Sequence, residues 1–175
     1  SVFATNGLAI LTPTSCEVQD TLNGMRCVQM VHPIDSEGKW KLLTISSILK
    51  VNGQLYTIKR VMPDFVGASG SVTVYAEDIW YQQADGWLFP DDQPITATTG
   101  QSALNGITFR TDYQYRQGSF IYAFQGTSDI TDVSISIDIA DGRTPIDAIL
   151  GSGGLVDQIG GELHRDNFSF SINQR

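Results

Sequence analysis

The chain has 175 residues, of which 41% are hydrophobic and 17% are charged, and this composition is typical of a folded globular protein rather than a disordered one. Eleven lysines and arginines stand against nineteen aspartates and glutamates, which gives a formal net charge of −8. The basic residues are scattered and form no stripe that could neutralise several phosphates, which argues against tight binding along a nucleic-acid backbone. The N-terminal segment lacks a basic stretch and a long apolar run, so we expect neither a secretion signal nor a membrane anchor there.

A β-hairpin is predicted around the three-residue turn Leu22-Asn23-Gly24, with Gly24 in the left-handed position. Its register pairs three residues of one strand with three of the other: Cys16 with Met30, Val18 with Val28 and Asp20 with Arg26. Cys27 then faces the side opposite to Cys16. A tighter turn at Asn23-Gly24 would return both cysteines to one face but roughly 13 Å apart along the strand, which is too far for a disulfide. We therefore expect two reduced, partly buried thiols, as suits assembly in a reducing cytoplasm.

A second hairpin is predicted in residues 42–61, around Asn52-Gly53. This dipeptide is the strongest short hairpin signal, and a two-residue turn places Leu49 opposite Tyr56. The segment Gly-Ala-Ser-Gly then interrupts the pattern, and residues 71–76 form another short strand. The first part of the chain is therefore rich in antiparallel strands.

The pattern changes after this strand. Residues 76–86 have the apolar spacing of a short helix that ends near its glycine. Residues 87–100 contain two prolines and several turn formers, and we interpret them as a domain boundary or an excursion loop. A second helix is predicted in residues 98–107, with a threonine at its start and Asn105-Gly106 as its C-terminal stop.

The C-terminal part combines strands with one well-marked helix. Residues 118–124 and 132–140 are predicted strands, and the second alternates apolar and polar residues, as expected of a strand with one face in water. Residues 143–151 are a predicted helix in which Thr144 is the N-cap and Gly151 the terminator. Three short strands follow, at residues 155–159, 161–165 and 168–172, with Asp166-Asn167 turning between the last two.

Together these elements predict the α+β class, with a mainly antiparallel β fold and two or three short helices. The change from hairpins to mixed elements divides the chain. We expect a β-rich N-terminal domain in residues 1–85 and an α/β portion in residues 86–175 that is incomplete at its C-terminal end.

The triplet His164-Arg165-Asp166 has the letters of a protein kinase catalytic loop. Such a loop needs an asparagine five residues after its aspartate, a glycine-rich phosphate loop and a paired lysine upstream. Ser171 stands at the asparagine position, and the chain contains no GxGxxG motif. We therefore interpret the triplet as part of a solvated β-turn between two apolar strands.

The other candidates for chemistry are weaker. His32 and His164 are far apart in the sequence and lack zinc-ligand spacing. A meeting of His32 with Cys16 in space is conceivable, but an ordinary packed histidine is the simpler interpretation. Asp138 and Asp141 bracket a turn without the ligand spacing of an EF-hand, and no carboxylate pair stands out for glycoside hydrolysis. We assign no catalytic, cofactor-binding or metal-binding residue and expect no enzymatic activity.

Four aromatic residues within a stretch of ten are the candidates for a binding site: Trp80, Tyr81, Trp87 and Phe89. They lie next to a polar loop. Exposed aromatic faces of this kind stack on sugars or become buried at protein interfaces. The alternative, that these side chains hold a loop against the core, stays open.

Three separated stretches carry a distinctive series of motifs. The first, LTPTSCEVQDTLNGMRCVQMVHPID, is a hairpin with Leu-Asn-Gly at its tip followed by His-Pro. The second, ISSILKVNGQLYTIKRV, leads to the strand and helix of VTVYAEDIW. The third and most specific is AILGSGGLVDQIGGELHRDNFSFSI. In this order the stretches resemble the N-terminal region of bacteriophage and prophage tail-associated proteins, the prophage endopeptidase tail or minor structural protein family. The match is loose in residues 86–130.

The resemblance implies a structural component of a phage or prophage tail tip or baseplate hub, with a hub-type β domain. Such a component attaches below the tail tube and supports host adsorption and DNA passage. The implied partners are further copies of the chain in a homotrimer, together with tail-tube and distal tail proteins. No specific nucleic-acid binding and no membrane anchor are implied. The implied location is the virion tail tip, after assembly in the bacterial host cytoplasm.

The family often carries a peptidase or lysin domain, but further toward the C-terminus, so the resemblance implies no such activity for this chain. Two other functions stay open. One is a carbohydrate-binding module that recognises a host cell-wall saccharide through exposed aromatic residues. The other is a fragment of a cell-wall hydrolase, which would require a cleft with convergent titratable groups.

Overall fold

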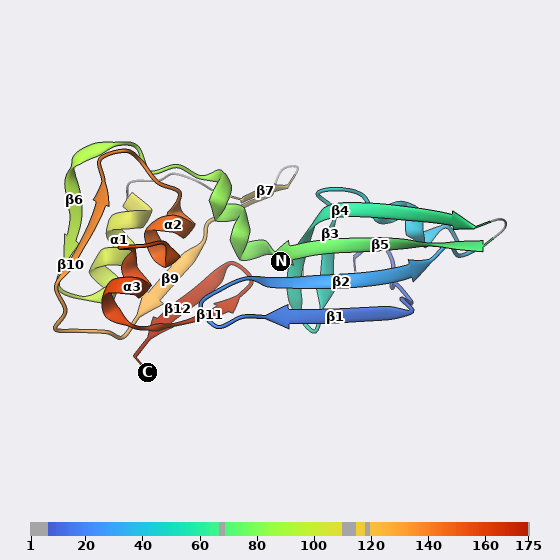
Figure 1. Cartoon of the computed structure of the whole chain (residues 1–175), viewed down its shortest axis with the longest axis horizontal. Coiled ribbons are helices and arrows are strands. Elements are labelled where there is room, and N and C mark those ends of the chain that lie inside the picture. Colours follow the sequence, from blue (N-terminus) through green and yellow to red (C-terminus); the bar gives the residue numbers. More distant parts are fainter. Residues whose placement is uncertain (1–6, 67–68, 110–114, 118–119, 175) are drawn as a thin grey trace. The chain divides into compact units, whose positions relative to one another are not determined.

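The computed structural model describes residues 7–66, 69–109, 115–117 and 120–174. The chain divides into two compact units (Figure 1), which we call unit 1 (Ser1–Thr21 and Met25–Ile79) and unit 2 (Leu22–Gly24 and Trp80–Arg175). This division falls after Ile79, whereas the sequence predicts a boundary after residue 85. The predicted division into two domains stays a prediction.

Unit 1 is built on one five-stranded sheet with the strand order β1-β2-β5-β4-β3. Its elements are β1 (Ser15–Asp20), β2 (Arg26–Pro33), the 3-10 helix η2 (Lys39–Leu42), β3 (Ile48–Val51), β4 (Gln54–Val66) and β5 (Ser69–Asp78). All four strand pairings in this sheet are antiparallel. Three of them join strands that are neighbours in the sequence, as hairpin signals predict.

Both predicted hairpins are present in the predicted registers. In the first, Cys16 pairs with Met30, Val18 with Val28 and Asp20 with Arg26. In the second, Leu49 pairs with Tyr56 across Asn52-Gly53, whose φ angles of 50° and 84° are those that a type I′ turn requires. One detail is wrong, because the left-handed residue of the first turn is Asn23, with φ 50°, rather than Gly24. Asparagine adopts this conformation more readily than most residues.

The apolar core of unit 1 consists of side chains from every strand except β1. Alternate residues of a strand point to the same face, and in β5 these are Val72, Val74 and Ala76, each at most 1% exposed. The buried cluster comprises Val28, Met30, Leu43, Leu49, Tyr56, Ile58, Val72, Val74 and Ala76. Each large aliphatic side chain contributes roughly 1.5–3 kcal/mol by leaving water, so this cluster is the main stabilising feature of the unit.

Unit 2 combines short helices with small sheets. Its elements, including the 3-10 helix that leads into it, are η3 (Ile79–Asp85), β6 (Asp91–Ala97), α1 (Gly100–Phe109), β7 (Tyr115–Gln117), β8 (Phe120–Tyr122), β9 (Gln125–Ser128), β10 (Ile135–Ile139), α2 (Pro145–Leu150), α3 (Leu155–Ile159), β11 (Glu162–Asp166) and β12 (Ser169–Asn173). The sheets are β10-β6, β11-β12-β9 and β7-β8. The helices gather between the β6–β10 pair and β9 (Figure 1), and α1 contacts both β6 and β9.

Two helices of unit 2 begin as the sequence predicts. The Thr144 hydroxyl accepts a hydrogen bond from the Asp147 backbone N–H at 3.1 Å, and Pro145 takes the first helical position of α2. At the start of α1 the Thr99 hydroxyl accepts from the Ser102 N–H at 3.0 Å. A side-chain oxygen at this position satisfies one of the backbone donors that the first helical turn leaves without a partner.

The predicted C-terminal stop of α1 at Asn105-Gly106 is wrong, because the helix continues through Gly106 to Phe109. Packing explains the glycine. A Cβ atom built on Gly106 would lie 2.6 Å from Ile95 Cγ2, which is far inside van der Waals contact. Gly106 therefore lets α1 pack closely against β6.

Replacing Gly106 with alanine is expected to destabilise the protein by about 1–3 kcal/mol, although alanine in an exposed helix favours folding by about 1 kcal/mol over glycine. The Cγ2 atom that would be displaced belongs to a β-branched side chain, which has little rotamer freedom. In an Ile95→Ala background the same substitution should cost nothing further. Urea unfolding of the original chain, the two single variants and the double variant checks this. An equal cost of Gly106→Ala with and without Ile95→Ala would contradict it.

Two other segments differ from their predicted form. Residues 155–159 form helix α3 rather than a strand, with Leu155 and Val156 buried and Gly160 closing the helix in the left-handed conformation. Short apolar runs of this length fit either structure. Residues 91–97, interpreted as part of a loop, form strand β6, which pairs with β10. Pro94 is tolerated there because β6 lies at the edge of its sheet.

The remaining predictions of element type hold where the structure describes them. Buried and exposed residues alternate along strand β10, so one of its faces is in water, as predicted. Strands β11 and β12 form the predicted C-terminal hairpin. Residues 79–85 are helical, but as a 3-10 helix. The chain is thus an α+β protein with mainly antiparallel strands, as the sequence predicts; one described pairing, β12 with β9, is parallel.

Candidate functional site

The four aromatic candidates divide into an inner pair and an outer pair. Trp80 is completely buried, and Tyr81 is partly buried. Trp87 and Phe89 are 48% and 67% exposed. The structure therefore does not present the four side chains on one surface, and it leaves Trp87 and Phe89 as the candidates for contact with a ligand or partner.

Trp80 belongs to the core of unit 2. Its ring meets those of Phe170 and Tyr81 edge to face, with centroids 5.5 and 5.4 Å apart, in the arrangement that aromatic pairs prefer. The Arg165 guanidinium lies 5.9 Å from the Trp80 ring and 5.6 Å from the Tyr81 ring. These contacts support the interpretation that was left open from the sequence, in which aromatic residues hold the segment against the core.

Arg165 shows what the His-Arg-Asp triplet does. Its Nη1 donates to the Gly24 carbonyl oxygen at 2.7 Å and to the Tyr81 hydroxyl at 2.8 Å, and Tyr81 donates to the same carbonyl. His164 is exposed, and Asp166 ends β11 at the hairpin turn. The triplet therefore has a structural role in a β-hairpin, as its sequence context predicts.

Residues 22–24 are held in unit 2 by a second set of hydrogen bonds that the sequence did not reveal. The Asn23 side-chain amide donates to the Gly161 carbonyl at 2.9 Å and accepts from the Leu163 N–H at 2.8 Å. One side chain thus satisfies both a donor and an acceptor of the backbone at the start of β11. The signal available in the sequence was only that of an Asn-Gly turn.

The histidines do not form a catalytic site. His32 is 0% exposed; its Nδ1 lies 2.7 Å from the Pro33 carbonyl oxygen, and its Nε2 accepts from the Thr12 N–H at 3.4 Å. Because a carbonyl only accepts, this geometry assigns the proton to Nδ1. Both ring nitrogens are thus engaged and cannot activate the thiol of Cys16. Cys16 is exposed and Cys27 buried, and both are free thiols.

A polar cluster lies at one end of the sheet of unit 1 and consists of Asp20, Arg26, Tyr56 and Asp78. Arg26 lies 3.4 Å from Asp20 and 3.5 Å from the fully buried Asp78. Burial raises the pKa of Tyr56; Asp78 and Asp20 add to this, and the Arg26 charge opposes it. The cluster is compact, its most exposed member is Asp20, and we interpret it as structural.

Tyr75 is the titratable residue of unit 1 with the clearest expected effect of pH. Burial, the Glu77 carboxylate and Cys27 raise its pKa to about 12, from about 10 in an unfolded chain. Between these values the folded state keeps a proton that the unfolded state has lost, so the stability contributed by Tyr75 falls as the pH rises from about 10 to about 12. Urea unfolding between pH 9 and 11 should show a smaller loss for Tyr75→Phe than for the original chain. An identical loss would contradict this assignment.

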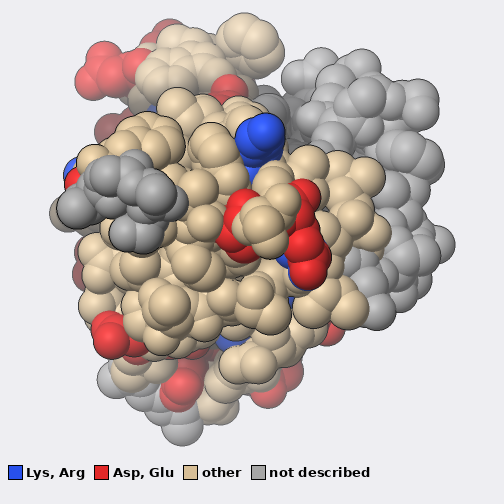
Figure 2. All heavy atoms as spheres, turned by 90° about the vertical axis from the view of Figure 1, so that its right-hand side faces the viewer, with Lys and Arg blue, Asp and Glu red and all other residues tan. Residues whose placement is uncertain are grey.

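Metal and phosphate sites were also sought among the charged side chains that the structure describes. Across the residues that the structure describes, no three His, Cys, Asp or Glu side chains form a group that could hold a metal ion. On the face shown in Figure 2, the coloured basic side chains form small groups and no broad patch. Every helix within the described ranges is too short or too polar to span a membrane.

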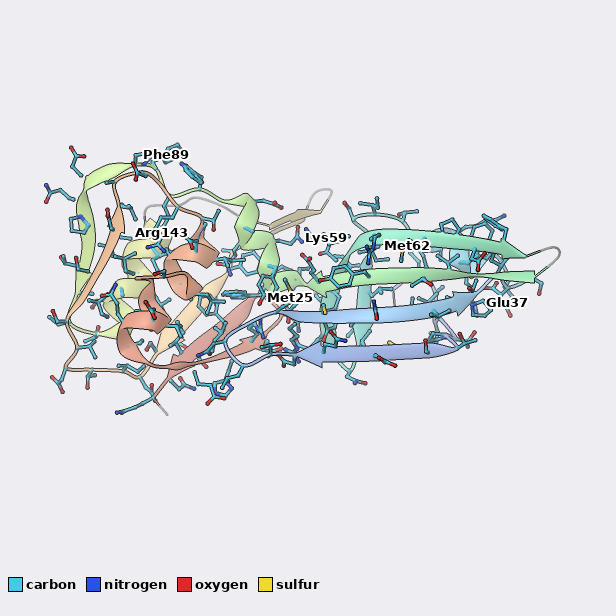
Figure 3. The ribbon with its side chains drawn as sticks, viewed as in Figure 1. Met25, Glu37, Lys59, Met62, Phe89 and Arg143 are labelled. Carbon is cyan, nitrogen blue, oxygen red and sulfur yellow. The ribbon has the colours of Figure 1, made fainter. Side chains whose placement is uncertain are left out.

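The surface around Trp87 and Phe89 is formed by two segments that run side by side in unit 2. Leu88, buried between the two aromatic residues, exchanges backbone hydrogen bonds with Arg143 in an isolated antiparallel bridge. A Cβ atom on Gly142 would lie 2.6 Å from Trp87 Cζ2, so the indole ring rests on the glycine backbone. Phe89 lies at the outer margin of the unit in Figure 3.

Comparisons with known proteins identify the first part of the chain. Residues 4–78 match the prophage endopeptidase tail N-terminal domain. None of the curated proteins is significantly similar to the chain in sequence.

Two solved structures share the fold. The prophage tail protein gp18 from Listeria monocytogenes EGD-e has a TM-score of 0.60 and 19% identity, over 90% of this chain and 43% of that one. The tail protein from Neisseria meningitidis MC58 has a TM-score of 0.58 and 11% identity, over 90% of this chain and 44% of that one. The chain thus spans less than half the length of either. Residues 4–78 thus match the prophage endopeptidase tail N-terminal domain, and the fold of the chain is similar to that of these two tail proteins.

Proposed function

We propose that the chain is a structural component of a phage or prophage tail tip or baseplate hub, attached below the tail tube. The domain match in residues 4–78 carries this proposal and supports a structural role in a phage tail. The likeness of fold to two prophage tail proteins over 90% of the chain adds to it. In this role the protein supports host adsorption and DNA passage from the virion tail tip.

The surface of unit 1 is suited to assembly. Strand β1 lies at one edge of the five-stranded sheet, and all six of its residues are exposed. An open edge of this kind is a template for pairing with another chain. The proposed partners are further copies of the chain in a homotrimer, and the tail-tube and distal tail proteins.

The charge and the cysteines are compatible with this role. A net charge of −8 would repel rather than hold the DNA that passes a ring of such subunits. Two free thiols suit assembly in the reducing cytoplasm of a bacterial host. The proposal assigns no enzymatic activity to these residues, since His32 and Arg165 make structural hydrogen bonds.

Immunogold electron microscopy of the particles released by the prophage tests the proposal. An antibody raised against this chain should label one end of the tail, the end away from the capsid. Mass measurement of the full-length protein by light scattering should give three copies. Label on capsids, along the whole tail or on no particle would overturn the proposed location, and a monomeric full-length protein would overturn the proposed homotrimer.

Carbohydrate binding is the second candidate function, and the exposure of Trp87 and Phe89 is the observation that favours it. Flat aromatic faces at a surface stack on sugar rings. Host cell-wall saccharide should then change the fluorescence of Trp87, while the buried Trp80 should not respond. No change on addition of the saccharide, or a change that survives Trp87→Phe, would remove this candidate.

A further inference from the structure

Asparagine followed by glycine occurs at four places in the chain: Asn6, Asn23, Asn52 and Asn105. Asparagine is a thermolabile residue, and a following glycine has no side chain to shield its backbone nitrogen. That nitrogen can attack the amide carbon of the asparagine side chain. Asn6 lies outside the described residues. The structure places the other three asparagines in surroundings that differ in how far they allow this attack.

The pair Asn52-Gly53 forms the tip of the hairpin of β3 and β4 in unit 1. Both residues are exposed, and a Cβ atom built on Gly53 would meet no other atom within 4 Å. Within the described part of the chain, the Asn52 side-chain amide has no hydrogen-bond partner. Exposed ends of this kind open more readily than the core of a protein, so the pair can leave its turn conformation without unfolding the sheet.

The pair Asn23-Gly24 also forms a turn, but its polar groups are engaged in unit 2. The Asn23 side-chain amide donates to the Gly161 carbonyl at 2.9 Å and accepts from the Leu163 N–H at 2.8 Å. The Gly24 carbonyl accepts from Arg165 Nη1 at 2.7 Å. Rotation of the Asn23 amide toward the Gly24 nitrogen would break both of its hydrogen bonds. We therefore expect this pair to be protected.

The pair Asn105-Gly106 lies inside helix α1. The Asn105 side-chain oxygen accepts from Gln101 Nε2 at 2.9 Å. In an α-helix each backbone N–H donates to the carbonyl four residues earlier, and the close packing of Gly106 on Ile95 depends on the helix. The Gly106 nitrogen could attack the Asn105 side chain only after the helix had opened at this point.

We propose that Asn52-Gly53 is a site of spontaneous deamidation and reacts first among the three described pairs. The Gly53 backbone nitrogen forms a bond to Asn52 Cγ, the bond from Cγ to Nδ2 breaks, and ammonia leaves with the proton of the Gly53 N–H. Water then opens the cyclic imide. Cleavage at Cγ gives aspartate, and cleavage at the backbone carbonyl carbon of Asn52 gives isoaspartate. Neither step oxidises or reduces the chain, and the inference does not depend on the proposed place in the tail.

The isoaspartate product disturbs the hairpin, whereas the aspartate product fits it. Asp-Gly forms the same type I′ turn as Asn-Gly. Isoaspartate instead adds a carbon atom to the backbone of the turn, and the turn sets the register of a hairpin. That register pairs Leu49 with Tyr56, which are 6% and 1% exposed. Formation of isoaspartate at residue 52 therefore loosens the core of unit 1.

The test is to store the 175-residue chain in warm, mildly alkaline buffer and to measure deamidation at each asparagine. Mass spectrometry of tryptic peptides does this, with fragmentation to separate Asn6 from Asn23. Asn52 should react at least about tenfold faster than Asn23 and Asn105, because these two must first lose the hydrogen bonds that hold them. In concentrated urea the three rates should become similar, since unfolding removes the protection.

An internal control and two variants separate the role of glycine from that of the turn. Asn167 is a matched control, because it also has a positive φ, of 55°, in a hairpin turn but is followed by a phenylalanine; it should react far more slowly than Asn52. Asn52→Gly removes the amide and keeps a sequence suited to the turn, so storage should not change its urea midpoint. Fresh Asn52→Asp should unfold close to the original chain, whereas the isoaspartate fraction of the stored chain should unfold at lower urea concentration.

Four results would overturn the inference. In the folded chain, Asn23 or Asn105 could react as fast as Asn52, so that the surroundings in the structure do not set the rate. Asn167 could react as fast as Asn52, so that the glycine has no effect. Asn52 could stay intact in the folded chain while it reacts in urea, which would show that the turn protects it. The isoaspartate fraction could unfold at the original urea concentration, which would remove the effect on the hairpin.

Discussion

Replacing Asp78 with alanine should lower the free energy of unfolding by about 3–5 kcal/mol. The Asp78 side chain is 0% exposed, and its carboxylate lies 3.5 Å from Arg26 Nη1 at the end of strand β5. The Arg26 side chain is itself only 19% exposed. Without Asp78, the Arg26 charge would stay largely buried and would lose its one fully buried carboxylate partner among these ion pairs.

Asp20→Ala is the matched control, because Asp20 contacts the same guanidinium at 3.4 Å but is 51% exposed. Exposed ion pairs contribute about 0–1 kcal/mol, so this variant should unfold at nearly the original urea concentration. Circular dichroism during urea unfolding measures the free energies of unfolding of Asp78→Ala and Asp20→Ala. Replacing Arg26 and Asp78 together with methionine and leucine should recover most of the loss, since apolar residues of similar volume can substitute for a buried ion pair. Equal losses for Asp78→Ala and Asp20→Ala would show that burial does not set the strength of this cluster.

Trp80→Ala should destabilise unit 2 by about 3–5 kcal/mol, as expected for removal of a large buried aromatic side chain. The Trp80 ring is 0% exposed and packs edge to face against Phe170 and Tyr81. Its removal would leave a cavity and take away the ring over which Arg165 lies. Protection of the β11 and β12 amides from hydrogen exchange should fall together with the unfolding free energy.

Phe89→Ala is the control for Trp80→Ala, since it removes an aromatic residue nine positions later that is 67% exposed. Substitutions at exposed positions without special contacts usually change stability by no more than about 0.5 kcal/mol. The midpoint temperature of thermal unfolding should therefore be clearly lower for Trp80→Ala than for Phe89→Ala. A large loss for Phe89→Ala would mean that this side chain contributes to the core despite its exposure.

The reliable predictions came from segments in which neighbouring residues decide the structure. The turn at Asn52-Gly53 set the pairing of Leu49 with Tyr56, and the cap at Thr144 set the start of α2. In each case the stabilising contacts lie within a few residues of one another, so the local sequence contains the information.

The errors occurred where distant contacts outweigh local preference. A glycine such as Gly106 usually marks the end of a helix. Here it lies inside α1, because Ile95 of strand β6 leaves no room for a Cβ atom at this position. The short apolar run in residues 155–159 is compatible with either a strand or a helix. The structure has a helix there, in which Leu155 and Val156 are buried. Residues 91–97 became a strand because β10 pairs with them, a partner about forty residues away that no local pattern could indicate.

The candidate site divides in the same way. By itself the sequence determined that aromatic residues gather between residues 80 and 89, that His164-Arg165-Asp166 is no kinase loop, and that the chain resembles prophage tail proteins. Only the tertiary structure decided that Trp80 is buried under Arg165, that Trp87 and Phe89 are exposed, and that the Trp87 ring lies against Gly142. The physical reason is that exposure depends on which distant segments cover a side chain. Phe170 packs against Trp80, whereas Trp87 lies against the backbone of Gly142, which has no side chain to cover it, and stays 48% exposed.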